Sequence, residues 1–251
     1  KWIADFRDPW SDFFPFKQFP MTNFMRNKHL VWEKKCLMNA DSVITTSPSL
    51  TRSYKLINSS AYTVTNGYEC LVDSVESNKF VIMYTGVMKS VQNPSNLWVV
   101  LNDICRENSQ FSKDLLVSLV GDFDNSIKND NSIISLKSSI RFEGYVDKNK
   151  LSEMIKNAQV LLLSSVNIKG VDNIIPGKLF LYLSVRRPIL AFSTPNSDVE
   201  EIIKETNSGK VFDYSNKVEL KKYVLSLYDQ YKHRNNKIDS LNISKYNFSN
   251  L

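Results

Sequence analysis

Charged side chains that could do chemistry stand together where an apolar run near the start of the sequence ends. Asp5, Arg7 and Asp8 lie at or just after the run 3–6, at the predicted end of a strand. Two carboxylates and an arginine at that position could line a cleft between domains. A structural salt bridge among them is the alternative interpretation.

Other catalytic chemistries find little support in the residue types. His29 and His233 are the only histidines and lie far apart, which leaves little material for a Ser-His-Asp triad or a metal cluster. The absence of a Gly-x-Gly-x-x-Gly motif and of a Walker loop argues against NAD enzymes and NTPases. The widely spaced Cys36, Cys70 and Cys105 argue against a disulfide framework and predict free thiols in a reducing compartment.

The composition is that of a chain which buries a core, with 42% hydrophobic and 23% charged residues among 251. No apolar run reaches the roughly 18 residues of a membrane span, and no signal peptide opens the sequence. Because the sequence begins at Lys1 and not at a methionine, we expect it to start partway through a longer protein. The net charge of +6 favours anionic partners such as phosphates or an anionic membrane, whereas no aromatic and basic array indicates nucleic-acid binding.

Short β-branched runs alternate with amphipathic segments along the chain. The run Val160–Leu163 is apolar throughout, which predicts a strand buried on both faces of a parallel sheet. Pro94 and Pro176 stand where the first turn of a helix is expected. The predicted fold is therefore α/β, with βαβ units in a doubly wound sheet. The predicted strands are Ile3–Phe6, Ser42–Thr46, Tyr62–Thr65, Phe80–Thr85, Leu115–Val120, Ile140–Glu143, Val160–Ser164, Ile189–Phe192 and Lys210–Phe212.

Segments spread over nearly the whole chain occur in an order and spacing shared with one enzyme family. In the first part these are Trp2–Trp10, Ala40–Ser47 and the junction Thr65–Tyr68. Together with the later segments they resemble a family-4-type glycosyltransferase of the GT-B fold (glycosyl transferases group 1), without the first large part of its N-terminal domain. The later segments are Tyr84–Gly86, Val120–Gly121, Ile140–Val146, Ala158–Leu163, Ile175–Leu183 and Arg187–Leu190.

The resemblance implies both an architecture and an activity. It implies a bacterial polysaccharide-biosynthesis enzyme that transfers a hexose, with retention, from a nucleotide diphosphate sugar to a cell-surface glycan or lipid-linked acceptor, without cofactor or metal. It places the protein in the cytoplasm, with peripheral contact at the anionic inner face of the cell membrane. The expected domains are a remnant of the N-terminal, acceptor-side Rossmann-like domain (1–72), a complete nucleotide-sugar-binding Rossmann-like domain (73–232) and a C-terminal tail packing back toward the N-terminal part (233–251).

The loop 172–175, ahead of Pro176, matches the phosphate- and sugar-binding turn of that family. Cleavage of the donor pushes negative charge onto the distal phosphate, and helix N-termini supply fixed donors against it. The resemblance makes the amides near Ile174 and Ile175 candidates for phosphate contact. Gly177 would permit close backbone approach, and Lys178 is a charge partner. The alternative interpretation is a plain βα turn with a solvated lysine.

Two further loops follow predicted strands. In the loop that begins at Gly86, the family holds the pyrophosphate with basic side chains, and Lys89 is the local candidate; a merely solvated lysine is the alternative. By the same resemblance, the Val146 backbone would meet the base and Tyr145 would flank it, unless this is a turn with a packing tyrosine. Asp122 and Asp124 invite a metal interpretation, but turn aspartates in solvent explain them more simply.

The family also carries two glutamates eight positions apart, and here those positions are Asn173 and Leu181. A leucine cannot grip ribose hydroxyls, and losing a charged hydrogen bond costs about 1.5–3 kcal/mol, or roughly 10- to 150-fold in donor affinity. Asn173 could still bond a sugar hydroxyl, so the catalytic candidates are Asn173, Asp8 and Arg7.

Two other functions stay open beside glycosyl transfer. Loss of the glutamates favours a non-catalytic nucleotide-sugar-binding or scaffold protein, and a non-hydrolysing sugar epimerase shares the architecture. We expect these residues alone not to turn over, because most of the acceptor-binding half is missing.

Overall fold

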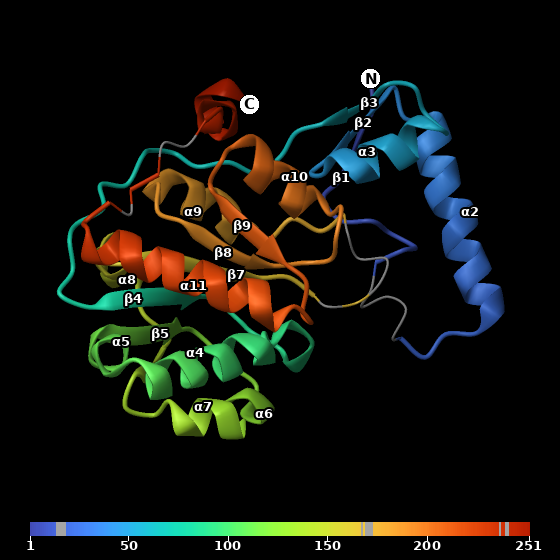
Figure 1. Cartoon of the computed structure of the whole chain (residues 1–251). Helices are drawn as coiled ribbons and strands as arrows, with labels where there is room; N and C mark the ends of the chain where they lie inside the picture. The colour runs from blue at the N-terminus through green and yellow to red at the C-terminus, as the bar shows by residue number, and fades with distance from the viewer. Residues whose placement is uncertain (14–18, 167, 169–172, 236, 239–240) are drawn as a thin grey trace.

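The computed structural model describes residues 1–13, 19–166, 168, 173–235, 237–238 and 241–251. Its strands form two parallel sheets, one from the start of the chain and one from the remainder (Figure 1). Every strand predicted from the sequence is present, with ends shifted by at most two residues.

The larger sheet has six parallel strands in the order β6-β5-β4-β7-β8-β9. The chain runs outward from β4 to β6, then crosses back over β4 to β7 and runs outward again to β9. A topological switch point therefore lies between β4 and β7, where such sheets bind ligands at the carboxyl edge. The strands are β4 (Phe80–Thr85), β5 (Leu115–Val120), β6 (Ile140–Gly144), β7 (Val160–Ser164), β8 (Ile189–Phe192) and β9 (Gly209–Phe212).

Helices cover both faces of this sheet, because its central strands are apolar on both sides. In β4, Phe80, Ile82 and Tyr84 point into one core, and Val81 and Met83 into the other. The first core packs under α4 (Ser95–Glu107), α5 (Ser109–Asp114), α6 (Asn125–Lys128), α7 (Asn131–Ser135) and α11 (Lys217–Lys232). The second packs under α8 (Lys148–Lys156), α9 (Lys178–Val185) and α10 (Asp198–Glu205).

The smaller sheet has three parallel strands in the order β1-β2-β3. These are β1 (Ile3–Phe6), β2 (Ser42–Thr45) and β3 (Ala61–Thr63), connected by α2 (Asn23–Asn39) and α3 (Pro48–Lys55). Ala4, Val43 and Ala61 face a small core under these two helices. Side chains on the opposite face, Ile3 and Tyr62 among them, are exposed.

Helix α9 begins two residues later than predicted from Pro176. Leu179 donates to the Pro176 carbonyl and Phe180 to the Gly177 carbonyl, each three residues back, so a tight turn precedes the regular helix. Lys178 is consequently the first helical residue, and Gly177 is the cap. Pro94 likewise caps α4 and does not stand inside its first turn.

The described residues after 232 lie against both parts of the chain. The Tyr68 amide donates to Tyr246 at 2.9 Å, and the Phe248 amide donates to Tyr68 at 3.0 Å. Lys245 pairs with Glu205 of α10. The boundaries at 72 and 232 remain a prediction.

Candidate functional site

Three glycines end adjacent strands of the large sheet at its carboxyl edge. Gly86, Gly121 and Gly144 follow or end β4, β5 and β6 and all have positive φ. The Gly86 amide donates to Val120, and the Gly121 amide donates to Gly144, each at 2.8 Å. A Cβ on Gly121 would lie 2.3 Å from the Gly86 carbonyl oxygen, so only glycine fits there. The strand ends therefore present close-packed bare backbone.

Helix α9 is fixed beside the end of β4 by a buried tyrosine. The Tyr182 hydroxyl accepts the Thr85 amide at 3.0 Å and lies 3.2 Å from the Thr85 hydroxyl. Burial of the tyrosine raises its pKa to about 12, so the hydroxyl stays neutral and can serve both partners. This contact places the first turn of α9 over the glycine at the start of the next loop.

Lys178, at that first turn, is a half-buried cation without a counter-ion. Its Nζ lies 3.8 Å from the centroid of the Tyr84 ring and 3.2 Å from where a Cβ on Gly86 would stand. Burial lowers the pKa of Lys178 to about 8. Among the described residues, no carboxylate lies within ion-pair distance of Nζ. The site thus holds a positive charge in search of an anion.

Backbone donors surround this ammonium group. The amides of Ile174, Ile175, Gly177 and Lys178 make no hydrogen bond to any other described residue. A Cβ on Gly177 would meet no atom within 4 Å, so the space above this cap is open. Asp172, at the start of the same loop, lies outside the described residues.

Lys89 differs from Lys178 because it has an aspartate partner. Its Nζ lies 3.2 Å from Asp124, which also accepts the Ser90 amide at 2.8 Å. The Ser90 amide, followed by Lys89, holds the pKa of the Asp124 carboxyl below its usual value. Asp124 thereby ties the β5 loop to the β4 loop. In the described part of the chain, no group of three or more His, Cys, Asp or Glu residues could hold a metal.

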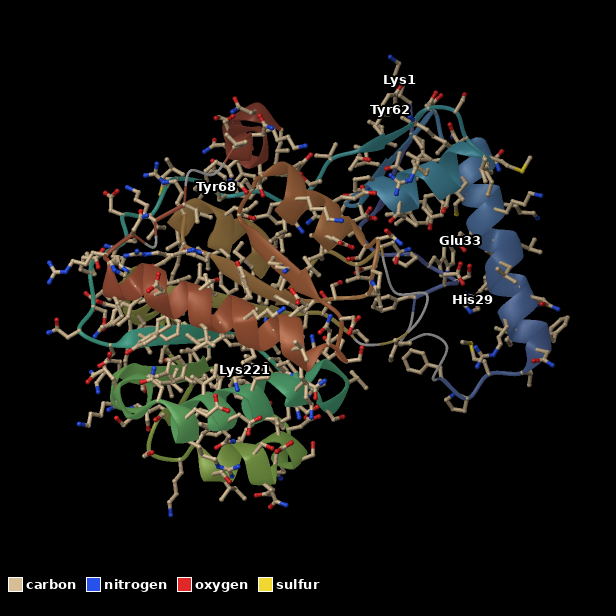
Figure 2. The ribbon with its side chains drawn as sticks, in the orientation of Figure 1. Lys1, His29, Glu33, Tyr62, Tyr68 and Lys221 are labelled. Carbon is tan, nitrogen blue, oxygen red and sulfur yellow. The ribbon has the colours of Figure 1, made fainter. Side chains whose placement is uncertain are left out.

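Asn173 lines a cavity of about 340 Å³ between the loop before α9 and the smaller unit. Asp12, Glu33, Ser53 and Tyr54 line it from the other side. The Tyr54 hydroxyl donates to Glu33 at 2.6 Å, and Figure 2 shows Glu33 on the side of α2 that faces the rest of the chain. Sequence reasoning missed Glu33, although its spacing from Leu37 puts a carboxylate on the buried face of α2.

The first-strand candidates are not among the residues that line this cavity. Arg7 Nε lies 3.5 Å from Asp5, and both side chains are largely exposed. Asp8 is also exposed. The alternative of a salt bridge thus describes Asp5 and Arg7.

The remaining candidates divide between a second cavity and the surface. Gly177 and Leu181 line a cavity of about 290 Å³ together with Lys148 and Ser152 of α8. Tyr145 is 93% exposed. Val146 and Ile175 are half-buried and pack against the core under α8 and α9. The structure therefore brings Gly86, Lys178 and the cap of α9 together, and places the other candidates around them.

A hydroxyl cluster at the end of β7 was also missed from the sequence. Tyr214 donates to the Ser165 carbonyl at 2.6 Å and lies 3.0 Å from the Ser164 hydroxyl. The Ser165 hydroxyl is buried, and no hydrogen-bond partner for it is found among the described residues. Its place directly after a strand that adjoins the switch point was the available signal.

The sequence and the fold were compared with known proteins. The family described as Glycosyl transferases group 1 matches residues 79–230, well over half of the chain. A sequence comparison with curated proteins found no match. Among solved structures, sucrose-phosphate synthase from Thermosynechococcus elongatus has a TM-score of 0.63 at 16% identity, covering 94% of this chain and 60% of its own. TarM has a TM-score of 0.62 at 11% identity, covering 83% of this chain and 41% of its own.

WaaG, titled a glycosyltransferase involved in lipopolysaccharide biosynthesis, has a TM-score of 0.56 at 10% identity, covering 97% of this chain and 72% of its own. The architecture is that of the GT-B glycosyltransferases. The chain belongs to the glycosyl transferases group 1 family. It spans 41% of TarM and 60% of the synthase.

Proposed function

We propose that this chain binds a nucleotide diphosphate sugar at the carboxyl edge of the six-stranded sheet and takes part in transfer of the sugar. The observation that carries the proposal is Lys178, a half-buried ammonium without a counter-ion at the start of α9. Membership of the glycosyl transferases group 1 family supports the same conclusion.

The diphosphate would lie between the Gly86 loop and the cap of α9. There the free amides of Ile174, Ile175, Gly177 and Lys178 meet the positive end of the helix dipole. When the anomeric bond breaks, the leaving diphosphate gains negative charge, and these fixed donors together with Lys178 would stabilise it. Val146 and Tyr145 would then meet the base.

The transferred sugar would point toward Asn173 and the 340 Å³ cavity. Its hydroxyls would bond the Asn173 amide, and the acceptor would enter from the smaller unit, the side on which Arg7 and Asp8 also lie. A retaining transfer of a hexose, without metal or cofactor, is proposed from the resemblance of the sequence.

Uridine nucleotides are the first ligands to test. TarM from S. aureus has been crystallised with UDP and α-GlcNAc-glycerol, and the pneumococcal O-GlcNAc transferase GtfA with UDP and GlcNAc. By analogy we propose UDP-sugars as donors and a cell-surface glycan or lipid-linked acceptor. A role in bacterial polysaccharide synthesis in the cytoplasm follows the same analogy.

Peripheral contact with an anionic membrane is proposed from α2. Its exposed side chains include Phe24, Val31 and Met38, with Lys28 and Lys35 on the same stripe. The one acidic residue of α2, Glu33, is buried. No helix in the described residues is both long and apolar enough to cross a bilayer. Flotation with vesicles of anionic lipid should carry the protein, and vesicles of neutral lipid should not.

Isothermal titration with UDP, GDP and UDP-glucose tests donor binding. We expect Lys178→Met to weaken the affinity for UDP about tenfold or more, since a charged contact to a phosphate is lost. Lys210→Met is the matched control, because Lys210 also lies over a ring, that of Phe212, but on β9 away from the site. Equal UDP affinities for wild type and Lys178→Met would refute the placement of the diphosphate.

A binding or scaffold protein without turnover is the second candidate. Leu181 favours it, because a leucine stands where the family has a ribose-binding glutamate. Release of UDP from UDP-glucose, with and without glycan acceptors, separates the two functions. Binding without release of UDP under all conditions would favour the scaffold.

A further inference from the structure

A buried carboxylate connects the two sheets through their helices. Asp198, the first residue of α10, is 1% exposed. Both of its oxygens lie 3.2 Å from the Ser49 amide, and one also accepts the Ser49 hydroxyl. The Arg52 guanidinium lies 3.7 Å from the carboxylate. We call Ser49, Arg52 and Asp198 the clasp.

The sequence of α3 leaves one donor for this carboxylate. Pro48 has no amide hydrogen, and the Ser47 hydroxyl accepts the Leu50 amide. The Ser49 amide is therefore the first-turn donor that has no partner inside α3. Because Asp198 also begins α10, its negative charge lies at the N-termini of two helices, and both dipoles favour it there.

The clasp joins parts of the chain that belong to different sheets. Helix α3 follows β2 of the smaller sheet, whereas α10 follows β8 of the larger one, and Figure 1 shows the two helices next to each other. Among the described residues, the hydrogen bonds to Asp198 all come from Ser49. Separation of the units would leave a buried carboxylate without partners, so the contact resists opening.

Helix α3 also lines the cavity at Asn173. Ser53 and Tyr54 lie on α3 one to two turns after Ser49 and form one wall, while Asn173 belongs to the opposite wall. The distance between these walls therefore depends on where α3 is held against the larger unit.

We propose that Asp198 is a positioning residue which sets the width of this cavity by holding α3 through Ser49 and Arg52. Its role in sugar transfer rests on the proposed function, whereas the contact between the units does not. The diphosphate site is built from the larger unit and does not need the clasp.

Small-angle X-ray scattering and UDP titration on the same variants test the proposal. In Asp198→Ala we expect the distance distribution to lengthen as the units separate, while the Kd for UDP stays within about twofold of wild type, because Gly86 and Lys178 lie far from the change. Asp198→Asn should restore much of the wild-type scattering, since its carbonyl oxygen still accepts the Ser49 amide. Glu201→Ala is the matched control: Glu201 also reaches Arg52, at 3.8 Å, but is exposed.

Scattering of Asp198→Ala that superimposes on wild type would overturn the proposal, as would an equal change in Glu201→Ala. If Asp198→Ala does not fold, Ser49→Ala removes only the hydroxyl donor and should show a smaller change in the same direction; no change would again refute the clasp. Absence of UDP binding to the wild-type chain would refute the proposed function but not the clasp, which the scattering decides independently.

Discussion

Replacement of Lys178 by methionine should stabilise the fold while it weakens ligand binding. The fall of the Lys178 pKa from 10.5 to about 8 corresponds to about 3 kcal/mol lost by keeping the ammonium charged in the folded chain. The Tyr84 ring, 3.8 Å from Nζ, returns about 1–2 kcal/mol of this by a cation–π contact. Methionine keeps most of the side-chain volume and carries no charge, so a net gain of about 1–2 kcal/mol is expected.

The gain should depend on pH in a defined window. Below pH 8 both folded and unfolded chains hold the Lys178 proton, and the cost of the buried charge is fully present. Between pH 8 and 10.5 the folded chain has released the proton while the unfolded chain still holds it, so the wild type becomes more stable relative to the variant as pH rises. The difference in stability should narrow across this window.

Thermal unfolding at pH 7, 8, 9 and 10 measures this directly. At about 2–4 °C per kcal/mol for a chain of this size, the variant should melt about 2–8 °C higher than wild type at pH 7. Lys210→Met, whose lysine is half-exposed and pairs with Glu219, should melt close to wild type. A lower melting temperature for Lys178→Met, or a difference independent of pH, would refute the reading of Lys178 as an unpaired buried charge.

Three other substitutions probe the same sheet edge. Leu181→Glu restores the glutamate at the family's ribose position and should tighten UDP binding about tenfold or more in calorimetry; an equal gain for 2′,3′-dideoxy-UDP would contradict a ribose contact. Gly121→Ala forces a Cβ to 2.3 Å from the Gly86 carbonyl at a φ of +122°, and should lower the free energy of unfolding by about 1–3 kcal/mol in urea titrations; a loss no greater than that of Gly177→Ala, where space is open, would contradict it. Tyr182→Phe removes the acceptor of the Thr85 amide and should cost about 1–3 kcal/mol and weaken UDP binding; unchanged UDP affinity would show that α9 is not held by this contact.

The fold was predictable because its strongest signals are local. The apolar run Val160–Leu163 could only be a strand covered on both faces, and the structure confirms it as part of β7. The start of α9 was predicted two residues too early, since a proline fits a first turn but also a preceding tight turn. Such ends depend on hydrogen bonds that the residue types do not determine.

The site was predictable only where a single loop supplies it. Lys178 and Gly86 could each be named from the sequence, but their contact requires Tyr182 to pack α9 beside β4, which is a tertiary interaction. Glu33 and Asp198 were missed because their importance lies in partners distant in sequence, Tyr54 and Ser49. No pattern within one helix reveals such a partner.

The bare face of the three-stranded sheet has a practical consequence. Ile3 is 58% and Tyr62 57% exposed there, and in the described residues β1 pairs with β2 alone, so its other edge offers free amides and carbonyls. Molecules of this chain are expected to self-associate through that edge at high concentration. Because side chains alternate along a strand, Ile3→Lys would make the edge repel its own copies while the neighbouring Ala4 keeps its place in the interior.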